Sequence, residues 1–283
     1  MFTTKKELKI KDRNYKVNIE AFQSAMDVAN SCRNRRITNS RFNDKSTDSF
    51  SKHWEGVNTY DEAMSLLSGG YQPTVEQLKD TMRISRQGNG KRISFRNNIQ
   101  GFAPVVPLAL KGVPNCMVDM SMKQIKCKVV DIYYDMTVPC YVDPQDIIKN
   151  GQKLLGAILR LEAEGYRFNL YAMQSYSDSG SADVLTVKVK SSDRPIDLKR
   201  ISFPLTHPAF FRVIGFDWYS RFPLGKYRSG YGCALKHSIG MNGARELVKE
   251  LYGDNAIYFA GTEILDNNED YLKEVLTNAK SKA

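Results

Sequence analysis

The pattern of hydrophobic and polar residues is clearest in the middle of the chain, where it has the period of a strand, then of a helix, then of a strand again. The first segment, Lys126–Val138, is rich in β-branched and aromatic residues, which favours a strand. Apolar residues between Ile147 and Leu161 recur every three or four positions, which predicts a helix with one buried face. A second strand is predicted at Tyr166–Tyr176. Two strands joined by a helix of this length predict a parallel βαβ unit with a right-handed crossover.

Both ends of this predicted helix carry residues that are typical of helix ends. Asp143 places a carboxylate where it can accept hydrogen bonds from the free N–H groups of the first turn. Pro144 follows at the first helical position, where no N–H donor is needed. Gly165 can adopt the left-handed conformation that commonly ends a helix. These three residues therefore mark where the helix begins and ends.

The N-terminal third is expected to be mainly helical. Apolar residues at helical spacing predict a helix over Val17–Arg33 and a pair of helices within His53–Leu78, whereas the polar segment Met1–Tyr15 indicates a strand-like arm or a frayed tail. Lys91–Ile99 alternates arginine and serine with apolar residues, which predicts a strand with a cationic outer face. The prolines of Gly101–Met122 indicate an irregular connection that packs the N-terminal part on the central unit.

The C-terminal third alternates predicted strands and helices around an aromatic segment. Six aromatic residues between His207 and Phe222 indicate buried core more than a surface for stacking bases. The glycine-rich segment Leu224–Gly240 is expected to be a flexible basic loop, and it lacks the spacing of a phosphate-binding P-loop. The remaining predicted elements are strands at Val184–Lys190 and Ala256–Ala260, and helices at Asn242–Tyr252 and Asp270–Ala279.

Taken together, these elements predict an α/β protein with a Rossmann-like sheet, flanking helices and a mainly helical N-terminal part. We expect a basic, mainly helical region over residues 1–100 and an α/β domain over residues 101–283. The 283 residues are 42% hydrophobic and 25% charged, which is ordinary for a globular protein. No apolar run approaches the roughly 20 residues of a membrane span, and Met1–Lys11 lacks the apolar centre of a signal peptide. A cytoplasmic protein without a membrane partner is therefore expected.

Cysteine usage argues against a disulfide framework or a zinc site. The five cysteines are odd in number, lie far apart and never form a C-x-x-C pair. The three histidines and the cysteines fall in no local signature of a nucleophilic enzyme. We expect no cofactor from these residues.

The charge of the chain points to polyanions as partners. Its formal net charge is +10, and a basic excess of this size attracts nucleic acid. A basic surface that only contacts solvent would have the same amino-acid composition, so both interpretations stay open. The candidate phosphate contacts are the arginine cluster before residue 42 and basic residues of the predicted strand and loop: Arg33, Arg35, Arg36, Arg41, Arg92, Arg96, Lys226 and Arg228.

One pattern with metal-binding chemistry lies at the end of the first central strand, where Asp135, Thr137 and Pro139 alternate with apolar residues. An aspartate ending a strand before a long helix resembles the von Willebrand factor A-like domains, whose D-x-S-x-S loop binds a divalent cation. Asp135 and Thr137 match the first two ligand positions, but Pro139 has no side-chain ligand at the third. Mg²⁺ requires near-octahedral oxygen ligation, so the resemblance implies a degenerate site for a divalent cation such as Mg²⁺.

Three longer runs resemble a group of uncharacterised proteins encoded by bacteriophages and prophages. They are HWEGVNTYDEAMSLLSGGY (His53–Tyr71), LLGAILRLEAEGYRFNLY (Leu154–Tyr171) and VKVKSSDRPIDLKRISFPLTHPAFFRVIGF (Val187–Phe216). In that group an aromatic helix-turn module precedes a degenerate von Willebrand A-like core. The resemblance implies a fold and a source, but no catalytic residues.

These observations support three hypotheses. The first is a non-enzymatic phage-encoded protein that docks a partner protein through its von Willebrand A-like core, with contact surfaces at Asp135–Pro139 and Leu224–Gly240. The second is a basic nucleic-acid-binding protein. The third, and the least favoured, is a metal-dependent enzyme that uses Asp135 with Asp131 or Asp197. The protein would act in the host-cell cytoplasm or in the virion, and its oligomeric state is left open.

Overall fold

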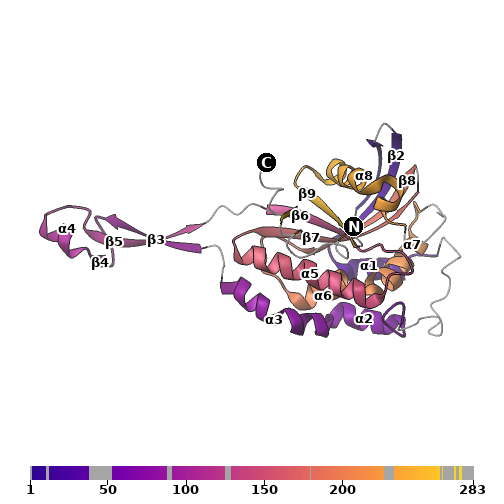
Figure 1. The fold of residues 1–283 in the computed structure, drawn as a ribbon, viewed down its shortest axis with the longest axis horizontal. Helices are drawn as coiled ribbons and strands as arrows, with labels where there is room; N and C mark the ends of the chain where they lie inside the picture. The colour runs from indigo at the N-terminus through magenta and orange to yellow at the C-terminus, as the bar shows by residue number, and fades with distance from the viewer. Residues whose placement is uncertain are drawn as a thin grey trace.

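The computed structural model describes residues 2–10, 13–37, 53–87, 91–124, 129–178, 180–225, 233–261, 263, 271 and 274–275. Within these ranges, side chains are described except at residues 13, 84–87, 91–94 and 121–124. The chain forms a main body around one large sheet, and a smaller three-stranded sheet stands away from it (Figure 1). The predicted closing helix at Asp270–Ala279 lies largely outside the described residues.

The main sheet has six strands in the order β1-β2-β8-β7-β6-β9. Strand β6 pairs in parallel with β7 on one side and with β9 on the other, and β2 pairs in parallel with β8. The β1–β2 and β7–β8 pairs are antiparallel, so the sheet is mixed. The strands are β1 (Phe2–Ile10), β2 (Arg13–Phe22), β6 (Val129–Asp135), β7 (Arg167–Ser177), β8 (Ser181–Lys190) and β9 (Ala256–Ala260).

The predicted βαβ unit is confirmed as β6, α5 (Pro144–Ala163) and the parallel strand β7. Asp143 caps the helix, because its Oδ1 accepts a hydrogen bond of 2.7 Å from the backbone N–H of Gln145. Gly165 follows the helix with a φ of 98°, which is the left-handed region. The local signals were sufficient here because the caps and the apolar period agree on the same boundaries.

Helices cover both faces of the main sheet, and each face has its own apolar core. Figure 1 shows α8 on one side of the sheet and α5, α6, α3 and α2 on the other. The aromatic segment is buried in the larger core, as predicted, through Phe210, Phe211, Phe216, Trp218, Tyr219 and Phe222. The helices of the larger core are α1 (Ala25–Arg33), α2 (Tyr60–Gly69), α3 (Gln72–Gln87), α5, α6 (Leu198–Thr206), the π-helix η2 (Phe210–Gly215) and α7 (Phe216–Arg221), and α8 (Leu235–Tyr252) covers the other face.

The prediction of a mainly helical N-terminal part is wrong, because the chain begins with the antiparallel strands β1 and β2. The predicted helix over Val17–Arg33 is a strand as far as Phe22 and a helix only from Ala25. Tyr15, Val17 and Ile19 are all buried on one face of β2, so the strand period of two applies here. These apolar residues also fit a helical spacing when they are combined with the residues of α1, and this overlap produced the error.

The segment Gly101–Met122 is more regular than predicted. It continues the confirmed strand β3 (Lys91–Asn98) with β4 (Ala103–Pro104), α4 (Val106–Leu110) and β5 (Met117–Gln124). These elements form the second sheet, in the order β3-β5-β4, and we call the unit of residues 91–124 the arm. Figure 1 shows the arm projecting from the main body instead of packing on it. The predicted domain boundary after residue 100 falls inside the arm, between β3 and β4.

Within the described residues, no helix combines the length and the apolar composition that a membrane span requires.

Two glycines in helices provide a test of the helix packing. A Cβ added to Gly151 of α5 would lie 2.2 Å from the backbone oxygen of Leu205 in α6, so Gly151→Ala must push the two helices apart. We expect a loss of about 1–3 kcal/mol in the free energy of unfolding, measured in urea. Gly69→Ala is the matched control because a Cβ there meets nothing within 4 Å, and the higher helix propensity of alanine predicts no loss. Equal effects of the two substitutions would contradict close α5–α6 packing.

Candidate functional site

Asp135 lies at the carboxyl end of β6, in the middle of the main sheet, and is completely buried. Its Oδ1 accepts a hydrogen bond from the backbone N–H of Thr137 at 3.1 Å. Its Oδ2 accepts hydrogen bonds from the Ser175 hydroxyl at 2.5 Å and from the Tyr258 hydroxyl at 2.9 Å. Ser175 belongs to β7 and Tyr258 to β9, so one carboxyl group joins β6 to both of its neighbours.

Thr137 and Ser175 extend this network. The Thr137 hydroxyl accepts a hydrogen bond from the backbone N–H of Ser175 at 2.9 Å. The Ser175 hydroxyl oxygen accepts one from the backbone N–H of Leu235, the first residue of α8, at 3.0 Å. The network thus reaches from the sheet to the helix that covers it. The sequence analysis did not identify Ser175 and Tyr258 as site residues. The one feature that could have indicated them is that each is a polar residue within a buried strand.

The structure therefore brings Asp135 and Thr137 together, as the sequence resemblance implied, but with their oxygens engaged by protein donors. A cation at Asp135 would have to displace the hydroxyl groups of Ser175 and Tyr258 from Oδ2. No group of three or more histidine, cysteine, aspartate or glutamate residues that could hold a metal ion occurs in the described parts of the chain. Metal binding by Asp135 and Thr137 stays a prediction.

Asp131 and Asp197 do not join Asp135. Asp131 lies four residues earlier on β6, roughly 13 Å along the strand, and accepts a hydrogen bond of 2.6 Å from Asn169. Asp197 caps α6 through the backbone N–H of Lys199 at 3.1 Å. It follows the carboxyl end of β8, which runs antiparallel to β7, so it belongs to the opposite end of the sheet from Asp135.

The predicted phosphate contacts are spread over separate parts of the molecule. Arg33, Arg35 and Arg36 lie together at the carboxyl end of α1, and Arg33 and Arg36 are exposed. Arg35 instead forms a two-pronged ion pair with the completely buried Glu20, with N–O distances of 2.7 Å and 2.6 Å. Arg35 therefore has a structural role in holding the segment after α1 to β2, and the Trp218 side chain of α7 donates to the same Glu20 carboxylate at 2.6 Å.

The other candidate residues lie in the arm or outside the described residues. Arg96 is on β3 of the arm, where its guanidinium pairs with Asp119 of β5 at 3.1 Å. Arg92 is also on β3, but its side chain is not among those described. Three candidates lie outside the described residues: Arg41, Lys226 and Arg228.

The arm carries most of the exposed large apolar side chains. Of the eleven such residues in the described chain, seven belong to the arm, and no residue between Phe95 and Met120 is buried. We call these seven residues the arm patch: Phe95 (64% exposed), Ile99 (67%), Phe102 (66%), Val106 (58%), Leu110 (84%), Val113 (37%) and Met120 (50%).

The strand register explains why part of the arm patch gathers on one face. Phe95 pairs directly with Met120 across β3 and β5, and successive side chains of a strand point to opposite faces. The ring of Phe102 lies 6.3 Å from that of Phe95 between centroids. The next pair along the strands, Arg96 with Asp119, points to the other face. A sheet face is normally buried against a second layer, and the apolar face of the arm has none within the described residues.

The pKa of Asp135 provides a test of the buried network. Burial raises this pKa from 3.8 to about 6, although the hydrogen bonds from Ser175, Thr137 and Tyr258 act in the opposite direction. The folded protein therefore holds the proton more tightly than the unfolded chain does. The resulting stabilisation is fully present below about pH 4 and is lost as the pH rises through about 6, by roughly 3 kcal/mol.

We expect the free energy of unfolding of the wild type, minus that of Asp135→Asn, to fall by most of this amount between pH 4 and pH 7 in urea titrations. His207, whose pKa burial lowers to about 4, changes the stability in the opposite direction. His207 is present in both the wild type and Asp135→Asn, so its contribution cancels in the difference between their free energies of unfolding. Parallel stability curves for the two proteins would show that Asp135 does not titrate in this range.

Comparison with known proteins gives a family and no function. Residues 4–281 match the family described as "Domain of unknown function (DUF7192)". No curated protein and no solved structure was found to match. The matched range covers nearly the whole chain, including the arm and all of the main sheet except the first two residues of β1. The chain therefore belongs to the DUF7192 family.

Proposed function

We propose that this protein is a non-enzymatic docking protein and that the arm patch is its contact surface for a partner protein. The observation that carries the proposal is that seven large apolar side chains of the arm are exposed and that no described residue between Phe95 and Met120 is buried. A small sheet needs a packed hydrophobic face for independent stability. Exposed apolar side chains that gather on one face, as Phe95, Phe102 and Met120 do, mark interaction sites in folded proteins. A partner that covers the arm patch would supply the missing layer.

The charge of the arm specifies the chemistry of the partner. Residues 91–124 contain five basic residues and one acidic residue, a formal net charge of +4. An apolar groove with an acidic rim is complementary to this surface. A second copy of this chain would bring the same +4 charge, and like charges oppose such an encounter. The basic residues of the arm are Lys91, Arg92, Arg96, Lys111 and Lys123, and the acidic one is Asp119.

This proposal moves the contact surface away from the one expected from sequence. Within Asp135–Pro139, every residue but Pro139 is buried, so this segment offers little surface to a partner. The other expected surface, Leu224–Gly240, lies partly outside the described residues. The arm is the better candidate because its apolar side chains are accessible.

For the main body, we propose kinship with the von Willebrand A-like domains and a bacteriophage or prophage source, as the sequence resemblance implies. The aspartate that ends β6, the long helix α5 and the parallel strand β7 support the kinship. The protein would then dock its partner in the host-cell cytoplasm or in the virion.

Photo-crosslinking tests the docking proposal. With a benzophenone amino acid at position 102, the full-length protein should form one discrete crosslinked product with another protein in producing cells. The same probe at Tyr141, which is 82% exposed but lies outside the arm, should not. With the crosslinked partner purified, we expect Leu110→Asp to raise the Kd at least about tenfold, as for a central contact residue. Lys111→Glu should raise it further than Lys111→Gln.

The melting temperature of these arm variants should stay within a degree or two of the wild type, because the substituted side chains are exposed. Equal crosslinking from positions 102 and 141, or an unchanged Kd for Leu110→Asp, would refute docking through the arm. Crosslinks only between copies of this chain would refute the acidic partner.

Nucleic-acid binding is the second candidate, and the exposed pair Arg33 and Arg36 favours it. We expect binding to a 20-base-pair duplex to weaken steeply with salt, and Arg33→Gln combined with Arg36→Gln to reduce the slope of log K against log salt by about one per lost phosphate contact. Lys79→Gln, at an exposed position of α3, serves as the control. An affinity that does not change between 50 mM and 300 mM salt would exclude this candidate.

A further inference from the structure

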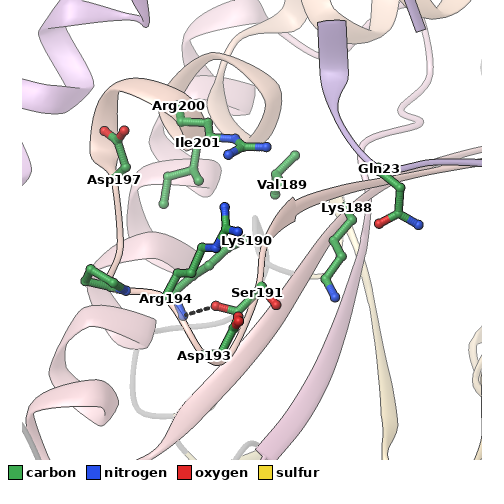
Figure 2. Close-up of a pocket in the computed structure, with 11 residues that line it drawn as sticks. Gln23, Lys188, Val189, Lys190, Ser191, Asp193, Arg194, Asp197, Arg200 and Ile201 are labelled. Atoms are coloured by element: carbon green, nitrogen blue, oxygen red, sulfur yellow. Dashed lines mark hydrogen bonds between the residues drawn. The ribbon is translucent and has the colours of Figure 1, made fainter. Parts of the chain in front are cut away.

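A cavity of about 560 Å³ lies at the end of the main sheet opposite to Asp135 (Figure 2). It is open to solvent on one side and is lined by the carboxyl end of β8, the following segment Ser191–Asp197 and the start of α6, with Gln23 contributed by the segment after β2. This volume is within the usual range for small-molecule sites, about 300–1,000 Å³. Apart from Gln23, all of its lining residues belong to the sequence run Val187–Phe216, which the docking role leaves unexplained.

One wall of the cavity is fixed by buried Lys190. Its ammonium group forms an ion pair with Glu162 at 2.7 Å and donates hydrogen bonds to the backbone oxygens of Phe168 at 3.1 Å and Ser191 at 3.3 Å. The next turn is closed by a hydrogen bond of 3.2 Å from the backbone N–H of Arg194 to the same Ser191 oxygen. Lys190 therefore holds the segment that carries Arg194 in place, and its own charge is balanced by Glu162.

Two guanidinium groups point into the cavity. Figure 2 shows Arg194 reaching in from the segment after β8 and Arg200 from α6. Among the described residues, neither guanidinium has an ion pair. Of the two carboxylates of the lining, Asp197 caps α6. Asp193 is exposed, and its pKa is lowered first by a hydrogen bond from Ser191 and also by the nearby charges of Arg194 and Lys188. Two like charges that converge on one space favour an anion between them.

The rest of the lining indicates what else the ligand carries. Val189, Pro195 and Ile201 add apolar surface. Lys188 also lines the cavity, but its ammonium group lies over the Tyr171 ring, 5.8 Å from the ring centroid. A phosphomonoester carries a charge of about −1.5 to −2 at neutral pH and offers three acceptor oxygens, which suits two planar guanidinium forks. A single carboxylate would satisfy one fork and leave the other unpaired.

We propose that this cavity binds a small organic phosphomonoester, with the phosphate held between Arg194 and Arg200 and the organic part against Val189, Pro195 and Ile201. The site is separate from the arm, so the protein would carry a ligand site at one end of its sheet and a docking surface on its projecting arm. The inference does not depend on the docking proposal, because none of its residues belongs to the arm.

Calorimetric titration of the full-length protein tests this site. The probes are inorganic phosphate, ribose 5-phosphate and adenosine 5′-monophosphate, with adenosine and succinate as the uncharged and carboxylate comparisons. We expect at least one of the two phosphomonoesters to bind more tightly than inorganic phosphate, adenosine or succinate. Arg194→Gln and Arg200→Gln should each raise the Kd of that phosphomonoester at least about tenfold, which is the loss typical of one charge-assisted contact.

Arg83→Gln is the matched control, since Arg83 is an exposed arginine on α3 outside the cavity. It should leave the Kd unchanged, and all three variants should keep the wild-type melting temperature because their side chains are exposed. The proposal is overturned if none of the phosphate probes binds at 1 mM, if succinate binds as tightly as the phosphomonoesters, or if Arg194→Gln and Arg200→Gln have no more effect than Arg83→Gln.

Discussion

The main sheet depends on the satisfaction of a single buried carboxyl group. Asp135 has no access to solvent, and a buried polar group without hydrogen bonds costs several kcal/mol. The fold meets this requirement with donors from three directions: the backbone of the following loop, Ser175 on one neighbouring strand and Tyr258 on the other. The two side-chain donors come from segments 40 and 123 residues away in the chain. The register of β6 against β7 and β9 is consequently fixed by polar chemistry as well as by the apolar cores.

The same principle attaches the outer parts of the body. Glu20 of β2 is buried and receives both Arg35, from the segment after α1, and the indole of Trp218 in α7. At the other end of the sheet, Lys190 of β8 is buried against Glu162 of α5. Removing one partner from such a pair leaves an uncompensated charge in the interior, which is far more costly than losing a surface ion pair. Each pair thus makes one arrangement of strand and helix much more favourable than its neighbours.

The sequence was informative wherever local signals agreed. The unit of β6, α5 and β7 could be predicted because Asp143, Pro144 and Gly165 mark the same helix that the apolar period marks. The N-terminal strands could not, because the alternation of Tyr15, Val17 and Ile19 merges with the helical spacing of α1. The arm was missed for another reason: its prolines exclude a central strand, but Pro104 lies at the end of an edge strand and Pro107 at the start of a helix, where proline is tolerated.

The candidate sites show the same division between local and long-range information. Asp135 and Thr137 are two residues apart, so their association could be proposed from sequence. Ser175, Tyr258 and the convergence of Arg194 with Arg200 depend on how distant segments are brought together, and no pattern in one sequence contains that information. Arg35 was assigned to a surface role because nothing nearby in the sequence indicated that Glu20 would be buried beside it.

The position of the arm in the chain has a mechanical consequence. The arm lies between α3, which packs on α5 and α6, and β6, which is hydrogen-bonded on both sides. A force applied to the arm by a bound assembly would therefore reach the centre of the sheet, where β6 can move along its axis only by shearing the hydrogen bonds to β7 and β9 together. An appendage attached to an edge strand would instead peel its bonds away one at a time. An attachment to the central strand therefore resists a pulling force better than an attachment to an edge strand would.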